Sequence, residues 1–204
     1  MRVFSGFSTS LMVCLVAIAG TAVLLGSGLV SVGKSGVSGQ QDGADSNFNK
    51  MMQVITHQRC VNCHPSDGIP KQGDDSHPHY FGLARGKDNH GFEATKCSTC
   101  HQDENNAFSG VPGAPEWSLA PHSMRWEGLS RAEIAESILD PKRNGNRNHE
   151  QIMHHLTEHA LVLWAWDPGV DADGVPREPP PVPKDEYIAA VKQWFEDGAV
   201  IPAE

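Results

Sequence analysis

Basic residues are scarce in this chain of 204 residues. Lysine and arginine together number 16 against 25 acidic residues, a formal net charge of −9. Arg2 and Lys34 are the only charged residues among the first 34, so the remainder holds 14 basic and 25 acidic side chains and a net charge of −11. This negative excess argues against nucleic acid or an anionic membrane surface as partner. It favours either simple solubility or docking onto a basic patch of a partner protein.

Residues 1–34 lack any charged side chain between Val3 and Gly33 and are mostly apolar. Such a stretch is typical of a secretory signal peptide or an N-terminal membrane anchor. Either would export the remainder, so we expect a periplasmic protein, soluble after cleavage or tethered to the cytoplasmic membrane. Residues 35–47, rich in Gly, Ser, Gln and Asp, are predicted to form a flexible tether. The compact domain is then expected at 48–204.

Convincing strand patterns are also absent, whereas helical periodicity marks both ends of the expected domain. The first predicted helix carries an apolar face formed by Phe48, Met51, Met52 and Ile55. The last one, capped by Asp185 and ended by Gly198, carries an apolar face formed by Ile188, Val191 and Phe195.

Two more helices are predicted between these ends. Capping-box patterns open them at Ser130–Glu133 and Asn148–Gln151. The intervening segments 65–96, 102–128 and 164–184 show little periodicity and are rich in Gly, Pro and Asp. The fold class predicted is therefore all-α, a helical frame with long loops.

One short pattern occurs twice: Cys60–His64 and Cys97–His101 both read C-x-x-C-H. This spacing lets two thiols reach one edge of a porphyrin while the following histidine becomes the proximal iron ligand. The sequence thus predicts two covalently attached haem c groups, bound through Cys60, Cys63, Cys97 and Cys100. A zinc site formed by the four cysteines and disulfides between the pairs are the alternatives. Histidine is only 11 of 204 residues, so its presence after both pairs favours haem.

The proximal iron ligands predicted by the motifs are His64 and His101. A low-spin electron carrier needs a second His or Met on each iron. Met124, in a proline-led loop ahead of a helix, is the first candidate, and a core-filling methionine is its alternative. His79, followed by two aromatic residues, is the second candidate, and its competitors are His77, His90 and His122.

A histidine-rich segment lies near the middle of the second internal helix. His155 and His159 are four residues apart, which places them on one helix face, but the metal-binding order H-E-x-x-H is not present. We interpret them as part of a solvated histidine face together with His154. The tryptophans outside the last helix are expected to pack against porphyrin edges.

The surroundings of the two motifs resemble a known family. The segments Arg59–Pro65, Gln72–His79, Lys96–Gln102, Gly110–Trp117 and Leu163–Gly169 are similar to those of small bacterial dihaem c-type cytochromes, often labelled as isoquinoline 1-oxidoreductase subunits. The resemblance implies a periplasmic electron-transfer subunit that accepts electrons from a dehydrogenase, such as a molybdenum hydroxylase. The predicted helix that leads into Cys60 and the predicted terminal helix also resemble those of cytochrome c. The resemblance implies a cytochrome c-like helical frame in which an insertion carries the second haem.

An enzymatic alternative stays open beside the electron carrier. In a dihaem peroxidase one iron keeps an open position for peroxide. Known enzymes of that class are longer and consist of two similar halves, and no duplication beyond C-x-x-C-H is visible here. Electron transfer is therefore the predicted function, with no independent catalytic residue.

Overall fold

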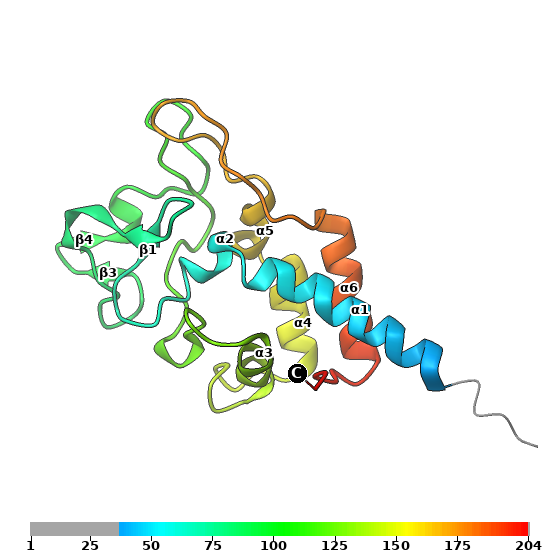
Figure 1. The fold of residues 1–204 in the computed structure, drawn as a ribbon. Coiled ribbons are helices and arrows are strands. Elements are labelled where there is room, and N and C mark those ends of the chain that lie inside the picture. The colour runs from blue at the N-terminus through cyan, green and yellow to red at the C-terminus, as the bar shows by residue number, and fades with distance from the viewer. Residues whose placement is uncertain (1–36, 204) are drawn as a thin grey trace, which may run out of the picture. The chain divides into compact units, whose positions relative to one another are not determined.

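A computed structural model describes residues 37–203, which belong to a compact unit beginning at Ser35 (Figure 1). The signal peptide or anchor predicted for residues 1–34 lies outside this described part. The described part is mostly helical, with long loops. Its six α-helices are α1 (Val37–Ile55), α2 (Gln58–Val61), α3 (Arg131–Leu139), α4 (His149–Glu158), α5 (Ala160–Leu163) and α6 (Lys184–Glu196). Among residues 37–203, none of the helices combines the length and apolarity needed to cross a bilayer.

The core forms where α1 and α6 pack against each other, with α4 also against α6 (Figure 1). All four apolar residues predicted on the first helix are at most 5% exposed. The ring centroids of Phe48 and Trp194 lie 6.2 Å apart across the α1–α6 contact. The first and last helices of the domain, far apart in sequence, therefore form one hydrophobic core.

Both capping boxes are present as predicted. The Ser130 side chain accepts a hydrogen bond from the Glu133 backbone N–H, and the Glu133 carboxylate accepts one from the Ser130 N–H. The same reciprocal pair joins Asn148 and Gln151 at the start of α4. These bonds satisfy backbone donors that would otherwise lack a partner at each helix start, and so fix where α3 and α4 begin.

Two features of the terminal helices differ from prediction. Helix α1 begins at Val37, inside the segment 35–47 expected to be a tether. Once the packed half of the helix has formed, each further residue adds a hydrogen bond without a new nucleation cost. In α6 the N-cap is Pro183, so Asp185 lies in the first turn, and the most buried face contains Tyr187, Ala190, Val191 and Trp194.

Strands occur despite the prediction of an all-α fold. β1 (Lys71–Gln72) pairs antiparallel with β2 (His77–Pro78), and β3 (Gly91–Phe92) pairs antiparallel with β4 (Thr95–Lys96). Each strand has two residues, too few for a pattern of alternating side chains to show in the sequence. The two hairpins lie together, away from α6 (Figure 1), and they organise the loop between the two C-x-x-C-H motifs.

Candidate functional site

The first motif follows directly from the core helix α1. The chain turns at His57, whose ring accepts a hydrogen bond from the Arg59 N–H and caps the short helix α2. The N–H groups of Cys63 and His64 then donate to the carbonyls of Cys60 and Val61. A continuous helical turn therefore holds the two cysteines and the histidine, on a segment anchored by the buried end of α1.

His64 is oriented by the loop that ends at Trp126. Its Nδ1 lies 2.6 Å from the carbonyl oxygen of Met124. A carbonyl oxygen can only accept, so Nδ1 carries the proton and Nε2 keeps its lone pair. The His64 ring also stacks on Trp126, with centroids 3.4 Å apart and planes 7° apart. This is the orientation in which an imidazole ligates a metal through Nε2.

A cavity of about 420 Å³ opens beside Cys60, Cys63 and His64. Every α-helix of the described part contributes to its wall, and the apolar lining includes Ile55, Leu119, Ile138, Ile152, Leu156 and Val162. Its volume falls within the range of ordinary cofactor pockets. Apolar walls, two adjacent thiols and an imidazole lone pair are the features that a covalently bound porphyrin requires, so the residues of this first site fit a haem c.

Burial dominates the electrostatics of the first site. It raises the pKa of the Cys60 thiol to about 12 and that of Cys63 to about 11. Burial also lowers the pKa of His64 to about 3, against the opposing effect of its bond to Met124. The neutral imidazole of His64 is the form that binds iron.

The second motif lies in the hairpin-bearing loop region. Cys97 directly follows β4 and opens a short 3₁₀ turn (Cys97–Thr99), and the Cys100 and His101 N–H groups donate to the Cys97 carbonyl. The His101 Nδ1 lies 2.7 Å from the carbonyl oxygen of Pro112. Its ring stacks on Trp117, with centroids 4.5 Å apart and planes 8° apart. The second site therefore orients its histidine in the same way as the first.

His79, predicted as an iron ligand, faces the histidine of the second motif. The ring centroids of His79 and His101 are 6.1 Å apart, with planes at 74°. The Nδ1 of His79 lies 2.9 Å from the carbonyl oxygen of Tyr80, so it carries the proton and Nε2 is free. Two metal–nitrogen bonds of about 2 Å each, plus the ring radii, span roughly 6 Å. The centroid distance thus matches that of two imidazoles bound to one metal atom.

The competitor His77 has another partner. Its Nδ1 lies 2.6 Å from the carboxylate of Asp75, and its ring tilts against Tyr80. His122 is exposed in a 3₁₀ turn. His90 lies between the two sites, because its carbonyl accepts from the Cys97 N–H while its side chain reaches the rim of the first cavity. Of His77, His79, His90 and His122, only His79 has its ring next to that of His101.

Tryptophans connect the two sites. Trp164 lines the first cavity and meets Trp117 edge to face, with centroids 4.9 Å apart. Trp117 in turn stacks on His101. The thiols of Cys63 and Cys97 are also close enough for the second to raise the pKa of the first. The two sites therefore share a wall only a few side chains thick.

Met124 is buried, with its sulfur in the core. Its Sδ accepts a hydrogen bond of 3.4 Å from the Ser137 hydroxyl. Its backbone carbonyl, as described, holds His64. The structure thus brings Met124 to the first site, next to the Nδ1 edge of the histidine ring.

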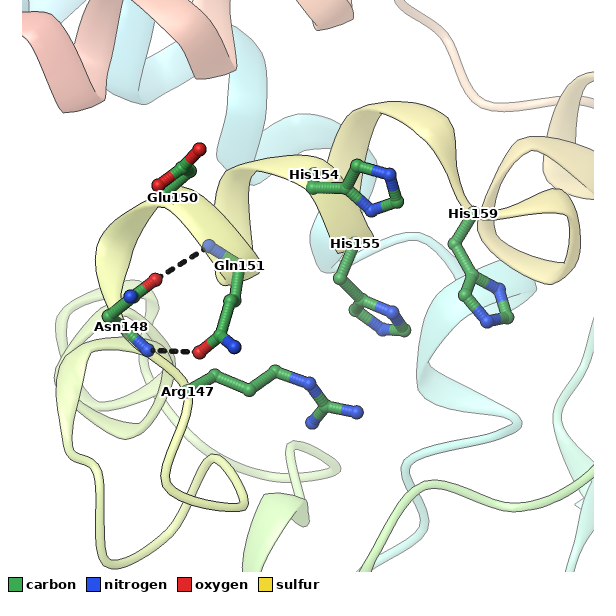
Figure 2. A pocket seen from close by; sticks show the side chains of 7 residues that line it. All are labelled: Arg147, Asn148, Glu150, Gln151, His154, His155 and His159. Atoms are coloured by element: carbon green, nitrogen blue, oxygen red, sulfur yellow. Dashed lines mark hydrogen bonds between the residues drawn. The ribbon is translucent and has the colours of Figure 1, made fainter.

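The predicted histidine face is present in part, because His154, His155 and His159, at the C-terminal end of α4, line one surface pocket (Figure 2). His154 is exposed and pairs with Glu158, but His155 and His159 line the first cavity. The i, i+3, i+4 pattern of Ile152, His155 and Leu156 in the sequence placed His155 on the apolar side, a signal that the polarity of histidine obscured.

Neither alternative use of the cysteines is visible in the described residues. Cys60, Cys63, Cys97 and Cys100 all have free thiols. Within residues 37–203 no group of three or more His, Cys, Asp or Glu side chains is placed to bind a single metal ion. The cysteines instead form two separate pairs, each beside its own histidine.

Comparisons of the chain with protein-family models, with curated proteins and with solved structures found no match.

Proposed function

We propose that this protein is a periplasmic dihaem c-type cytochrome that transfers single electrons from a dehydrogenase to a downstream acceptor. The observation that carries the proposal is the shared geometry of the two motif histidines. Each donates Nδ1–H to a loop carbonyl and stacks on a tryptophan, which leaves Nε2 available beside a pair of thiols. Such preorganisation of both ligands is expected for two iron sites.

The chain's residues would hold two haems in fixed positions. Cys60 and Cys63 would bind the first and Cys97 and Cys100 the second, with His64 and His101 as the proximal ligands. His79, facing His101 at 6.1 Å, completes the second site in this proposal. Reversible uptake of one electron per iron is the chemistry that haem supplies when bound.

The wall between the sites supports transfer within the molecule. Trp164 lines the first cavity and packs edge to face on Trp117, which stacks on His101. A path of packed aromatic side chains therefore joins the two sites, and a short separation favours electron transfer between them. The helical frame of α1 and α6, with the chain passing from α1 into Cys60, further supports a cytochrome c-like fold with the second haem in an insertion.

The partner in this proposal is a periplasmic dehydrogenase, and the resemblance of the motif segments points to a molybdenum hydroxylase. The net charge of −11 outside residues 1–34 favours a basic docking patch on that partner. Reduction by such a donor should slow as ionic strength rises, because screening weakens steering between opposite charges.

Production of the full chain with a c-type haem maturation system tests the proposal. We expect two haems per chain that remain attached after denaturation. The double variant Cys60→Ser/Cys63→Ser should lose one of them, and Cys97→Ser/Cys100→Ser the other. Absorption spectra should show low-spin iron that does not react with peroxide. A purified chain without covalent haem, or one with peroxide turnover, would contradict the proposal.

A further inference from the structure

The opposite side of the first haem site needs a ligand, and its identity is an inference that rests on the proposed function. A methionine there would give a higher reduction potential than a histidine. Besides His64, four histidine or methionine side chains line this cavity: His90, Met124, His155 and His159. Their contacts distinguish them.

The contacts of Met124 disfavour it. Its carbonyl oxygen lies against Nδ1 of His64, on the ring edge away from Nε2. A sulfur ligand opposite His64 would lie beyond both the ring and the iron, roughly 6 Å past Nδ1. The three bonds from Cα to Sδ span only about 4 Å. The sulfur already accepts a hydrogen bond from Ser137, in the core.

His159 and His90 are less well placed than His155 to bind the iron of the first haem. The Nε2 of His159 pairs with the Glu116 carboxylate at 3.0 Å, at the end of α4. The His90 side chain is 51% exposed and reaches only the rim of the cavity. Binding of iron through Nε2 of His159 would break its contact with Glu116, and its unpartnered, buried Nδ1 lies on the ring edge nearer the backbone. Binding by His90 would require its loop to move.

His155 needs no such change. It projects from α4 between Ile152 and Leu156, both 4% exposed, which fix this face of the helix against the core. Among the described residues, no hydrogen bond is made by its ring. Figure 2 shows the ring extending away from the helix, between Arg147 and His159. His155 and His64 line the same cavity, and the His155 ring packs against that of His159, with centroids 4.8 Å apart.

The charges around His155 keep it in the metal-binding form. Burial, together with His159, Arg147 and His154, lowers the pKa of His155 to about 4. A neutral imidazole keeps a nitrogen lone pair that can bind iron, and the His155 ring lines the same cavity as His64.

We propose that His155 is the second axial ligand of the first haem, so that each haem is held between two histidines, His64 with His155 and His101 with His79. Helix α4, rather than the loop around Met124, then closes the first site. Because histidine replaces methionine, both haems would have low reduction potentials.

The test compares His155→Ala with His154→Ala, its exposed neighbour on the same helix, in the haem-loaded full chain. Electron paramagnetic resonance should show one of the two low-spin signals replaced by a high-spin signal in His155→Ala only. Added imidazole should restore the low-spin signal, which a merely structural defect would not allow. His155→Met, a second variant, should stay low-spin and raise the potential of one haem.

Other outcomes would overturn the assignment. Two unchanged low-spin haems in His155→Ala would do so, as would conversion to high spin in Met124→Leu, His159→Ala or His90→Ala. Absence of covalent haem in the unsubstituted chain is a different result, because it would contradict the proposed function itself.

Discussion

The two C-x-x-C-H sites have the same local geometry and very different surroundings. The first opens into a cavity to which all six described α-helices contribute, and His64 is half-buried. The second rests on short hairpins and turns, and Cys100 is exposed. Next to it, Phe81 is 89% and Phe92 51% exposed. The first haem would therefore complete a hydrophobic core, whereas the second would be attached to a structure that other contacts already hold.

The largest expected difference between the two sites is in the stability that the protein loses when one haem is absent. Cys60→Ser/Cys63→Ser would leave a cavity of about 420 Å³ in the core. Loss of the apolar contacts that the haem would make there should cost several kcal/mol, a large share of the stability of a typical domain. We expect that variant to lose cooperative unfolding in circular dichroism, while Cys97→Ser/Cys100→Ser keeps it. Equal melting of both variants would remove the proposed distinction between the sites.

Replacement of the stacking tryptophan should likewise cost more stability at the first site than at the second. Trp126, which stacks on His64, is 5% exposed, so Trp126→Ala should reduce the free energy of unfolding by about 3–5 kcal/mol. Trp117, which stacks on His101, is only half-buried, and Trp117→Ala should cost about 1–2 kcal/mol. Urea unfolding of the haem-loaded variants measures both values. A larger loss for Trp117 would mean that the second site carries more of the fold than inferred.

His79→Ala should alter the second haem with little effect on stability. Loss of the ring that faces His101 should convert one haem to high spin and allow it to bind cyanide. The free energy of unfolding should change by about 1 kcal/mol at most, because His79 lies in a loop. His77→Ala is the matched control, since His77 is bound to Asp75 instead. A low-spin spectrum in His79→Ala would exclude His79 as ligand.

The smallest effect concerns a carboxylate near the first site. The Glu127 carboxylate accepts hydrogen bonds from the Ser66 hydroxyl and N–H, and these lower its pKa below 4.5. The stabilisation is therefore present above about pH 4.5 and lost as the pH falls through the lower folded-state pKa. The Glu127 side chain is 32% exposed, and solvent screening keeps the expected effect below about 1 kcal/mol. Denaturation of Glu127→Gln at pH 7 and pH 4 should show a smaller pH difference than the unsubstituted chain, and an equal difference would refute this.

Local patterns in the sequence predicted much of the helical frame. The two capping boxes and the buried face from Phe48 to Ile55 appear as expected, because both depend on residues only three or four positions apart. The cap and buried face of α6 were less accurate, since Tyr187 and Trp194 are buried by α1, which the spacing within α6 does not encode. The two-residue strands could not be predicted because they are defined by pairing partners.

The sequence by itself determined the chemistry of each proximal half-site, because cysteines and histidine lie within five consecutive residues and one turn brings them together. Only the tertiary structure decided what faces them. The carbonyls of Met124 and Pro112, the stacking tryptophans, His79 opposite His101 and His155 in the first cavity come from distant segments. Their approach depends on helix packing and loop closure, which no local spacing records. The physical reason is that a second iron ligand comes from a residue distant in sequence and is placed by tertiary packing. The residues of a C-x-x-C-H motif, in contrast, are brought together by a single turn of the chain.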